Sequence, residues 1–362
     1  MKRKNRLLLS ATFCVLGGLT GITEENLISE THAELRRHLA ANGMEGASAV
    51  YYKGDGHTLI IYQEIGRNLS CLKGLDIHNL YARDIGMERL DGIEVLENLQ
   101  TLDICFNHVT DFSPLRNLPL RSLKIAGNPV RDISPVLKPS LRELNIFGTE
   151  IDDLACLTNT ALTKLVIGDE PVMRSFKTLS MLPLKQLVFS QCSEMQIGDI
   201  ASLRLERLDV SYIQQDDLCH LTNMPFQELV LRNSGITSLA PLASLPIRSL
   251  TISSGSLVFL NGIERLPLEE LHLINSRVMD VWPIRNMRLK ELTLLCDDGD
   301  LTTITNLPLH TLYLKKELAV KNIPLLKTME TLEFIGFSRH PLDGRYTAKE
   351  FFEIYGKEER EP

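Results

Sequence analysis

The stretch Leu120-Arg-Ser-Leu123-Lys-Ile125-Ala-Gly-Asn128-Pro-Val130 decides the fold of this 362-residue chain. Counted from Leu120 as position 1, it has apolar residues at positions 1, 4 and 6, and a turn follows. Side chains alternate between two faces in an extended chain, so positions 4 and 6 share one face while positions 3, 5 and 7 share the other. The stretch therefore predicts a short strand that buries one of its faces.

The same pattern recurs along most of the chain. After a first interval of 27 residues, the units follow one another at steps of 20 to 22 residues, and position 4 is leucine in every unit. The thirteen units begin at Leu72, Leu99, Leu120, Leu141, Leu162, Leu184, Leu205, Phe226, Ile247, Leu268, Leu289, Leu309 and Met329. A single unit cannot bury its apolar face alone, so the repeat predicts units stacked in parallel around one column of leucines.

This repeat resembles the unit of leucine-rich repeat proteins. The return segments Asp111-Phe-Ser-Pro-Leu115, Asp132-Ile-Ser-Pro-Val136 and Asp280-Val-Trp-Pro-Ile284 resemble the short-repeat subclass of bacterial internalin-like proteins. The resemblance covers residues 72–345 and implies an α/β leucine-rich repeat solenoid. In such a right-handed superhelix, one curved parallel β-sheet lines the concave face and 3₁₀ or irregular turns form the convex side. The consensus asparagine remains only at Asn107 and Asn128, and later units carry Thr149, Cys192, Ser234, Gly255 and Ser276.

The chain divides into four predicted segments: a signal peptide (1–22), a helix and hairpin cap (23–70), a solenoid of about 13 units (71–345) and a C-terminal capping helix with tail (346–362). Basic residues precede the apolar run of the first segment, which favours export to the periplasm, cell surface or medium. A retained anchor is the alternative. Two strands, 47–52 and 57–62, flank Gly54-Asp-Gly56, and the capping box Thr347-Ala-Lys-Glu350 precedes the closing helix.

Composition and motifs point away from catalysis. The net charge of −7 is a poor match for a nucleic-acid backbone. No C-x-x-C pair, phosphate-binding loop, dinucleotide fingerprint or nucleophile elbow occurs, and the scattered histidines do not share a helical face. We therefore expect unpaired thiols, no metal, no cofactor and no enzyme activity. Five aspartates at one phase of the unit are expected to cap the return segments: Asp111, Asp132, Asp153, Asp217 and Asp280. The cluster Asp297-Asp298-Gly-Asp300 is interpreted as a solvated loop, with cation binding as the alternative.

The concave sheet surface is the predicted site of binding. Its side chains point away from the leucine column, and exposed aromatic residues and arginine are the usual anchors of protein interfaces. The candidate residues are Phe106, Phe147, Tyr212, Arg232, Asn233, His272, Ile274 and Tyr313. High β-propensity alone also favours such residues at exposed strand positions. We expect a protein partner; recognition of an extracellular glycan and a structural envelope component without a specific ligand remain alternatives.

Overall fold

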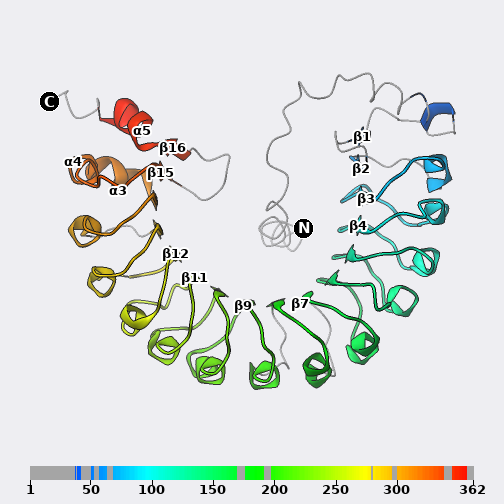
Figure 1. Cartoon of the computed structure of the whole chain (residues 1–362), viewed down its shortest axis with the longest axis horizontal. Coiled ribbons are helices and arrows are strands. Elements are labelled where there is room, and N and C mark those ends of the chain that lie inside the picture. The colour runs from blue at the N-terminus through cyan, green and yellow to red at the C-terminus, as the bar shows by residue number, and fades with distance from the viewer. Residues whose placement is uncertain are drawn as a thin grey trace, which may run out of the picture.

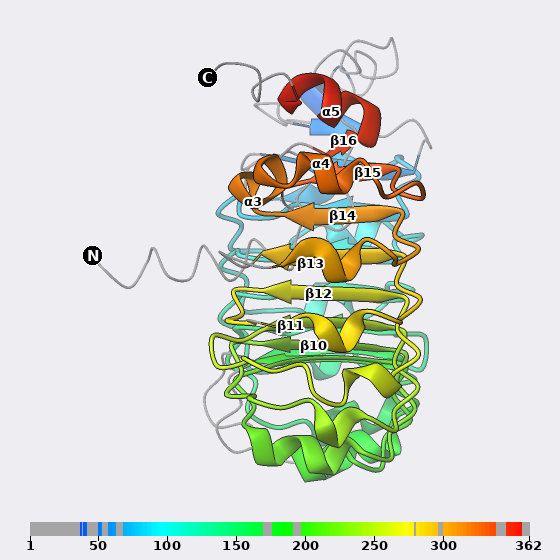
Figure 2. The ribbon, with the colours of Figure 1, turned by 90° about the vertical axis from the view of Figure 1, so that its left-hand side faces the viewer.

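A computed structural model of the chain describes residues 37, 39–41, 50–52, 57–62, 68–168, 176–190, 197–278, 280–295, 300–337 and 345–356. The described chain winds into an open arc, with strands along its inner side and short helices along its outer side (Figure 1). Seen from the side, successive strands stack as a ladder, and the C-terminal helices lie at one end of it (Figure 2). The chain thus has the architecture of a leucine-rich repeat solenoid.

In the described part of the chain, one sheet of sixteen strands follows the order of the sequence. Strands β2 to β15 run parallel to their neighbours, while β1 and β16 pair antiparallel at the two ends. The strands are β1 (Val50–Tyr52), β2 (Thr58–Ile61), β3 (Asn79–Tyr81), β4 (Thr101–Asp103), β5 (Ser122–Lys124), β6 (Glu143–Asn145), β7 (Lys164–Gly168), β8 (Gln186–Ser190), β9 (Arg207–Ser211), β10 (Glu228–Arg232), β11 (Ser249–Ser253), β12 (Glu270–Ile274), β13 (Glu291–Leu295), β14 (Thr311–Leu314), β15 (Phe334–Gly336) and β16 (Arg345–Thr347).

The predicted leucine column is confirmed by the strand register. Leu123 pairs with Leu144, and Leu144 pairs with Leu165 on the next strand. All three side chains are 0% exposed and belong to one hydrophobic core that continues along the whole arc. Burial of each such leucine contributes on the order of 1.5–3 kcal/mol, so the stacked column is the main source of stability.

The predicted unit starts are wrong at both ends. Leu80, and not Leu75, pairs with Leu102 in the leucine column, so the first solenoid unit begins at Ile77. At the other end Leu312 pairs with Ile335 rather than with Leu332. The apolar pattern matches two overlapping registers at each end. The corrected step from Ile77 to Leu99 is 22 residues, which agrees with the other units.

Short 3₁₀ helices form the outer side in nearly every unit. They are η3 (Leu69–Leu72), η4 (Ile93–Val95), η5 (Ser113–Leu115), η6 (Ser134–Val136), η7 (Ala155–Asn159), η8 (Phe176–Met181), η9 (Ile197–Ile200), η10 (Gln215–Leu221), η11 (Ala240–Leu242), η12 (Ile263–Arg265), η13 (Trp282–Ile284) and η14 (Leu301–Ile304). A unit of 20 to 22 residues that includes the strand leaves room for only a short helix on the outer side.

Aspartates start several of these turns, as the sequence predicted. The Oδ1 atoms of Asp111, Asp132, Asp153 and Asp280 each accept a hydrogen bond of 2.7–2.9 Å from the main-chain N–H two residues later. Asp217 differs, because its carboxylate accepts from the preceding Gln214 N–H instead. Asp300 also caps a turn, through the N–H of Thr302 at 2.9 Å. Asp297 and Asp298 lie outside the described residues.

Both ends of the sheet carry additional elements. At the N-terminal end, β1 pairs antiparallel with β2, and Leu39 is fully buried in the core. Most of the predicted helix near residues 23–42 lies outside the described residues, as does the whole predicted signal segment. At the C-terminal end α3 (Lys316–Lys321) and α4 (Ile323–Leu326) follow β14, and α5 (Ala348–Tyr355) follows β16. The Thr347 hydroxyl and the Glu350 carboxylate form the capping box of α5. None of the helices in the described part of the chain combines the length and apolar character that a bilayer crossing requires.

Candidate functional site

The side chains at positions 3, 5 and 7 of each repeat unit point to the inner face of the arc. The middle column, at position 5, is mostly buried rather than exposed: His272 is 0% exposed and Tyr313 is 6% exposed. Side chains converge on the inside of a curved sheet, and those of positions 3 and 7 cover the column between them. The expected exposure is therefore wrong for His272 and Tyr313. His272 instead lies with its Nδ1 2.9 Å from the Thr293 hydroxyl.

A charged network occupies the inner face at β9 and β10. Arg232 at position 7 donates two hydrogen bonds to Asp209, with Nε–Oδ1 and Nη2–Oδ2 distances of 2.8 and 3.0 Å. Asp209 is buried, and Arg207 lies 3.8 Å from it while also pairing with Glu228. A bidentate carboxylate fixes the plane of a guanidinium. The Arg232 side chain, 33% exposed, is thus held in one orientation beside the solvent.

Tyr212 and Asn233 lie next to this network. They occupy position 8 of adjacent units, and the Asn233 amide lies within hydrogen-bonding distance, 3.4 Å, of the Tyr212 hydroxyl. The Tyr212 N–H donates to the Arg232 carbonyl at 2.9 Å. Three of the predicted site residues, Tyr212, Arg232 and Asn233, are therefore brought together by the stacking of two units. Tyr212 is 47% exposed.

Among the described residues, position 8 has a left-handed backbone in seven units. Its occupants there are Asp84, Phe106, Gly127, Gly148, Tyr212, Asn233 and Asn275. Glycine, asparagine and aspartate adopt this conformation readily, whereas a bulky aromatic residue is strained by about 1–3 kcal/mol. Phe106 is half-buried over Gly127, where an added Cβ would come within 2.7 Å of its ring, so packing explains this aromatic side chain. Tyr212 is 47% exposed, so its ring is less covered than that of Phe106.

The remaining predicted residues lie apart from this cluster. Phe106 and Phe147 are half-buried and belong to the units of β4 and β6, and half-buried Ile274 ends β12. Near Phe147, Glu143 lies between Lys124 and Lys164, at 3.6 and 2.6 Å. Burial acts to raise the pKa of Glu143, but the Lys164 hydrogen bond and the two lysine charges hold it below its usual value. The inner face thus carries separate charged clusters and not one continuous aromatic surface.

The described cysteines give no sign of a nucleophile. Cys71, Cys105, Cys156 and Cys219 are free thiols, and the first two are buried. Burial raises the pKa of the Cys105 thiol strongly, which keeps it protonated at neutral pH. Cys14, Cys192 and Cys296 lie outside the described residues.

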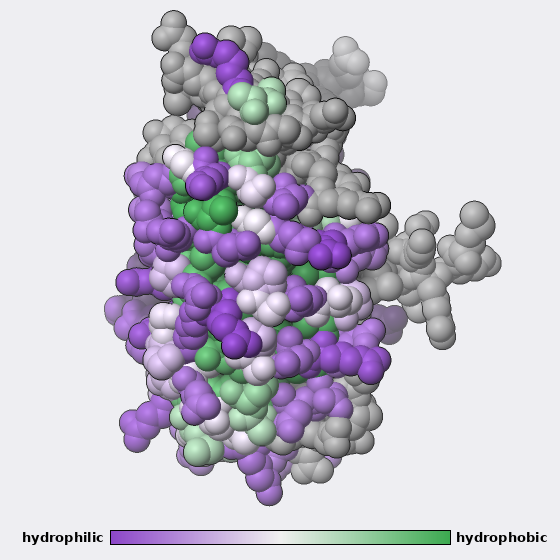
Figure 3. Space-filling view, turned by 90° about the vertical axis from the view of Figure 1, so that its right-hand side faces the viewer, coloured by the Kyte–Doolittle hydropathy of each residue, from purple (hydrophilic) through white to green (hydrophobic). Residues whose placement is uncertain are grey.

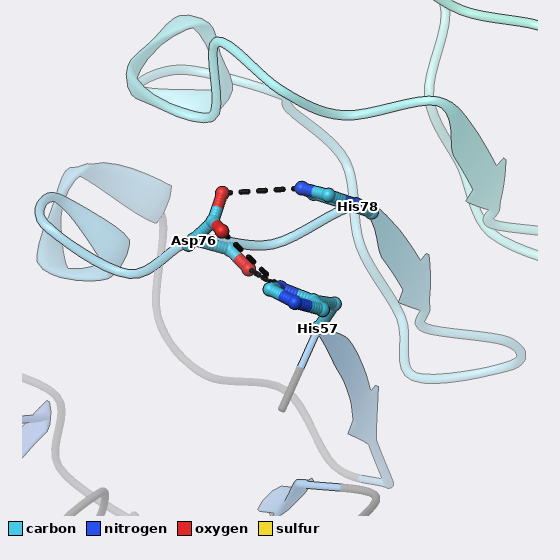
Figure 4. Close-up of side chains that lie close together, drawn as sticks. All are labelled: His57, Asp76 and His78. Carbon is cyan, nitrogen blue, oxygen red and sulfur yellow. Dashed lines mark hydrogen bonds and ion pairs between the residues drawn. The ribbon is translucent and has the colours of Figure 1, made fainter. Parts of the chain in front are cut away.

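One cluster of polar side chains was not recognised from the repeat pattern of the sequence. His57, Asp76 and His78 meet beside the first strands of the solenoid (Figure 4). The two histidines are 21 residues apart, which is one repeat, so stacking makes them neighbours. The incorrect first unit start hid the fact that both occupy position 2 of successive units.

Comparisons with known structures found several resemblances, and of the three that follow the first has a TM-score above 0.5. An internalin, InlF, of Listeria monocytogenes is 24% identical to this chain over 73% of it and 81% of the internalin, with a TM-score of 0.51. A leucine-rich repeat protein of Leptospira interrogans is 17% identical and has a TM-score of 0.44, over 76% of this chain and 81% of that one. The leucine-rich repeat ectodomain of the Arabidopsis receptor kinase HAESA, crystallised with a peptide hormone ligand, is 16% identical with a TM-score of 0.41, over 86% of this chain and 66% of that one.

Comparisons by sequence found no counterpart: no protein-family model matches the chain, and no curated protein matches it. The structural likeness to the internalin establishes the class of fold, a leucine-rich repeat solenoid with short convex turns. At 24% identity it does not extend to a ligand.

Proposed function

We propose that the chain is an exported, non-enzymatic binding module that holds a protein partner on the inner face of its arc. The contact is centred on Arg232 of the inner face and on Tyr212 and Asn233, which directly follow β9 and β10 at the rim of that face. Together they combine an exposed ring, a fixed guanidinium and an amide on two adjacent units. A preformed sheet binds without the entropic cost of ordering a flexible surface. Arginine and tyrosine are enriched among the residues that dominate protein interfaces.

One observation carries this proposal: Tyr212 is an exposed aromatic residue at a strained backbone position. Its φ angle is +65°, and the same position in other units is taken by Asn233 and Asn275, which suit it better. Backbone strain at an exposed position is typical of functional sites. The tyrosine therefore marks the part of the inner face that contacts the partner.

A protein partner fits this surface better than a glycan. Glycan recognition favours two or more coplanar aromatic rings flanked by polar side chains. In the described part of the chain, the ring–ring contacts lie at the C-terminal cap and between His57 and His78, not beside Tyr212. On the outer face of the N-terminal units, hydrophilic side chains predominate and apolar areas are narrow strips between them (Figure 3).

The variant Tyr212→Asn tests the proposal without disturbing the backbone. Asparagine tolerates the left-handed conformation, so we expect stability to rise by about 1 kcal/mol while partner recovery in a quantitative pull-down from envelope extracts falls about tenfold or more. Trp282→Ala is the matched control, because it removes a 58% exposed aromatic residue from the return segment η13. Unchanged recovery with Tyr212→Asn, or loss only with Trp282→Ala, would reject the inner-face site.

The proposal of export depends on the apolar segment 7–22. We expect protein recovered from the producing cell to begin near residue 23, and N-terminal sequencing measures this directly. Cytosolic material that begins at Met1 would contradict export while leaving the binding surface unaffected.

A further inference from the structure

His57, Asp76 and His78 gather on the edge of the solenoid where β2 and β3 begin (Figure 4). His57 Nδ1 lies 3.2 Å from Asp76 Oδ2, and His78 Nε2 lies 3.2 Å from Asp76 Oδ1. The potential ligand atoms of the three residues all lie within 4.8 Å of one another. The side chains are 34–53% exposed, so an ion can reach them from solvent.

The backbone ladder builds this arrangement. The His57 carbonyl accepts hydrogen bonds from the N–H groups of His78 and Asn79, at 2.9 and 3.1 Å. Every parallel step of the sheet repeats this pair of bonds at the same position, so the spacing of His57 and His78 is set by the fold. Their rings are stacked, with centroids 4.4 Å apart and an interplanar angle of 13°. The two imidazoles are therefore held side by side before any ligand binds.

Asp76 is oriented from both sides. Its main-chain oxygen lies 3.0 Å from His57 Nδ1, which places that ring beside the loop before β3; metal binding through Nδ1 would replace this hydrogen bond. Its Oδ1 accepts a hydrogen bond of 2.8 Å from the Asn98 side chain, which comes from the next unit. Such outer partners fix the orientation of ligating carboxylates in metal sites. The Asp76 carboxylate thus faces two imidazoles, and the hydrogen bond from Asn98 holds its orientation.

The identity of the donors selects the kind of ion. Imidazole nitrogen suits zinc, copper, nickel and iron, whereas calcium and magnesium take oxygen ligands. A zinc ion lies about 2.0–2.1 Å from nitrogen or oxygen ligands, so tetrahedral ligand atoms lie about 3.3 Å apart. Small side-chain rotations bring the three donors to that spacing. An exposed ion pair with Asp76 would need only one histidine. A second histidine stacked on the first adds repulsion when both rings are charged, so an ion pair alone does not explain the arrangement.

We propose that His57, Asp76 and His78 form a three-ligand site for a divalent transition metal of the zinc class, with water as the fourth ligand. The ion links β2 to β3, because His57 precedes β2 and the other two ligands precede β3. Metal binding therefore stabilises the N-terminal end of the sheet, where β1 and β2 join the repeat. This site is independent of the proposed binding surface around Tyr212.

Zinc titration of the tag-free, chelator-treated full chain tests the site. We expect calorimetry to show one Zn²⁺ bound per chain, Co²⁺ to give the visible absorption of a four-coordinate site, and Zn²⁺ to raise the melting temperature. Asn98→Ala should weaken binding about tenfold to a hundredfold, as loss of an outer partner does, and His78→Gln should weaken it further. Calcium alone should produce none of these effects.

His310→Ala is the matched control. His310 occupies the same position of a later unit, but its backbone neighbours at that position are Lys290 and Glu333. This variant should bind zinc like the unaltered chain. The melting temperature of His78→Gln in chelator, expected to equal that of the metal-free parent, shows that the variant is folded. Zinc binding that is absent from the parent, or unchanged in folded His78→Gln and in Asp76→Ala, would overturn the proposal.

Discussion

The units around β4 and β5 share one fold with those around β10 to β12. The two groups differ in how the buried polar groups of their turns are hydrogen-bonded. In the first group Asn128, fully buried, accepts from the Val109 N–H and donates to the carbonyls of Ile104 and Ile125, all at 2.9–3.0 Å. Asn107 makes equivalent bonds one unit earlier. In the second group the hydroxyls of Ser234 and Ser276 are buried and have no hydrogen-bond partner among the described residues.

The unit of β11 shows how the second group departs from the consensus. The residue at the asparagine position is Gly255, which is exposed, and the neighbouring Ser254 is buried instead. Its hydroxyl donates to the Ser234 carbonyl at 2.6 Å. Since the strand register continues unchanged through β10, β11 and β12, the asparagine ladder is not required for stacking. The leucine column specifies the fold, and the asparagines add local stability at one end.

The largest expected effect separates the two groups directly. Asn128→Ala leaves the Val109 N–H and two carbonyls buried without their partner, so we expect the free energy of unfolding to fall by about 2–4 kcal/mol. Ser276→Ala removes an unpartnered hydroxyl and should change it by less than about 0.5 kcal/mol. Chemical denaturation measures both, and hydrogen exchange at Val109 localises the first. Equal losses in the two variants would show that the difference between the groups is not energetic.

A smaller effect concerns the caps of the return segments. Hydrogen bonds from the N–H and hydroxyl groups of Ser113 and Ser134 lower the pKa values of Asp111 and Asp132 below the ordinary 3.8. A lowered folded-state pKa gives stability that is present above about pH 4 and is lost as the pH falls through the folded value. The corresponding residue near β10 is Ser238, whose hydroxyl accepts from the Ala240 N–H and does not titrate in this range.

The double variant Asp111→Asn and Asp132→Asn tests whether these two carboxylates cause the loss of stability in acid. Asparagine keeps the acceptor oxygen, so stability at pH 7 should change by less than about 1 kcal/mol, while the loss of stability between pH 4 and pH 2 becomes shallower. Ser238→Ala should shift stability by a similar amount at both pH values. Denaturation curves at the two pH values provide the measurement. A loss in acid that is as steep in the double variant as in the parent would contradict the role of these carboxylates.

Sequence periodicity predicted the middle of the solenoid but not its ends. From Leu102 to Leu312 every fourth-position leucine lies in the column, because each has a neighbour one step before and one step after it. At Leu75 and Leu332 a second apolar pattern overlaps the first, and each lies at an end of the leucine repeat. At the N-terminal end the pairing of Leu59 on β2 with Leu80 decides the register. The error at Leu75 also concealed the common phase of His57 and His78. A search for polar residues repeated at the unit spacing could have found the pair.

The inner face shows a second limit of sequence reasoning. Alternation correctly assigns His272 and Tyr313 to the face opposite the leucines, but it does not state how much solvent reaches them. Their burial depends on curvature and on the long side chains of flanking columns. The contact between Tyr212, Arg232 and Asn233 likewise depends on which units are adjacent. The sequence named these residues as candidates but did not predict that they meet.

The sequence by itself determined the solenoid, the parallel sheet and the continuous leucine column, because a strict repeat of leucines about 21 residues apart can be buried only by stacking identical turns. Tertiary structure decided which inner-face side chains reach solvent and which polar residues meet at the edge, since both depend on the curvature and exact register of strands that are distant in the chain. Asp76 between His57 and His78 is the clearest case. Its neighbours are set by the stacking of β2, β3 and β4, and not by the residues beside it in sequence.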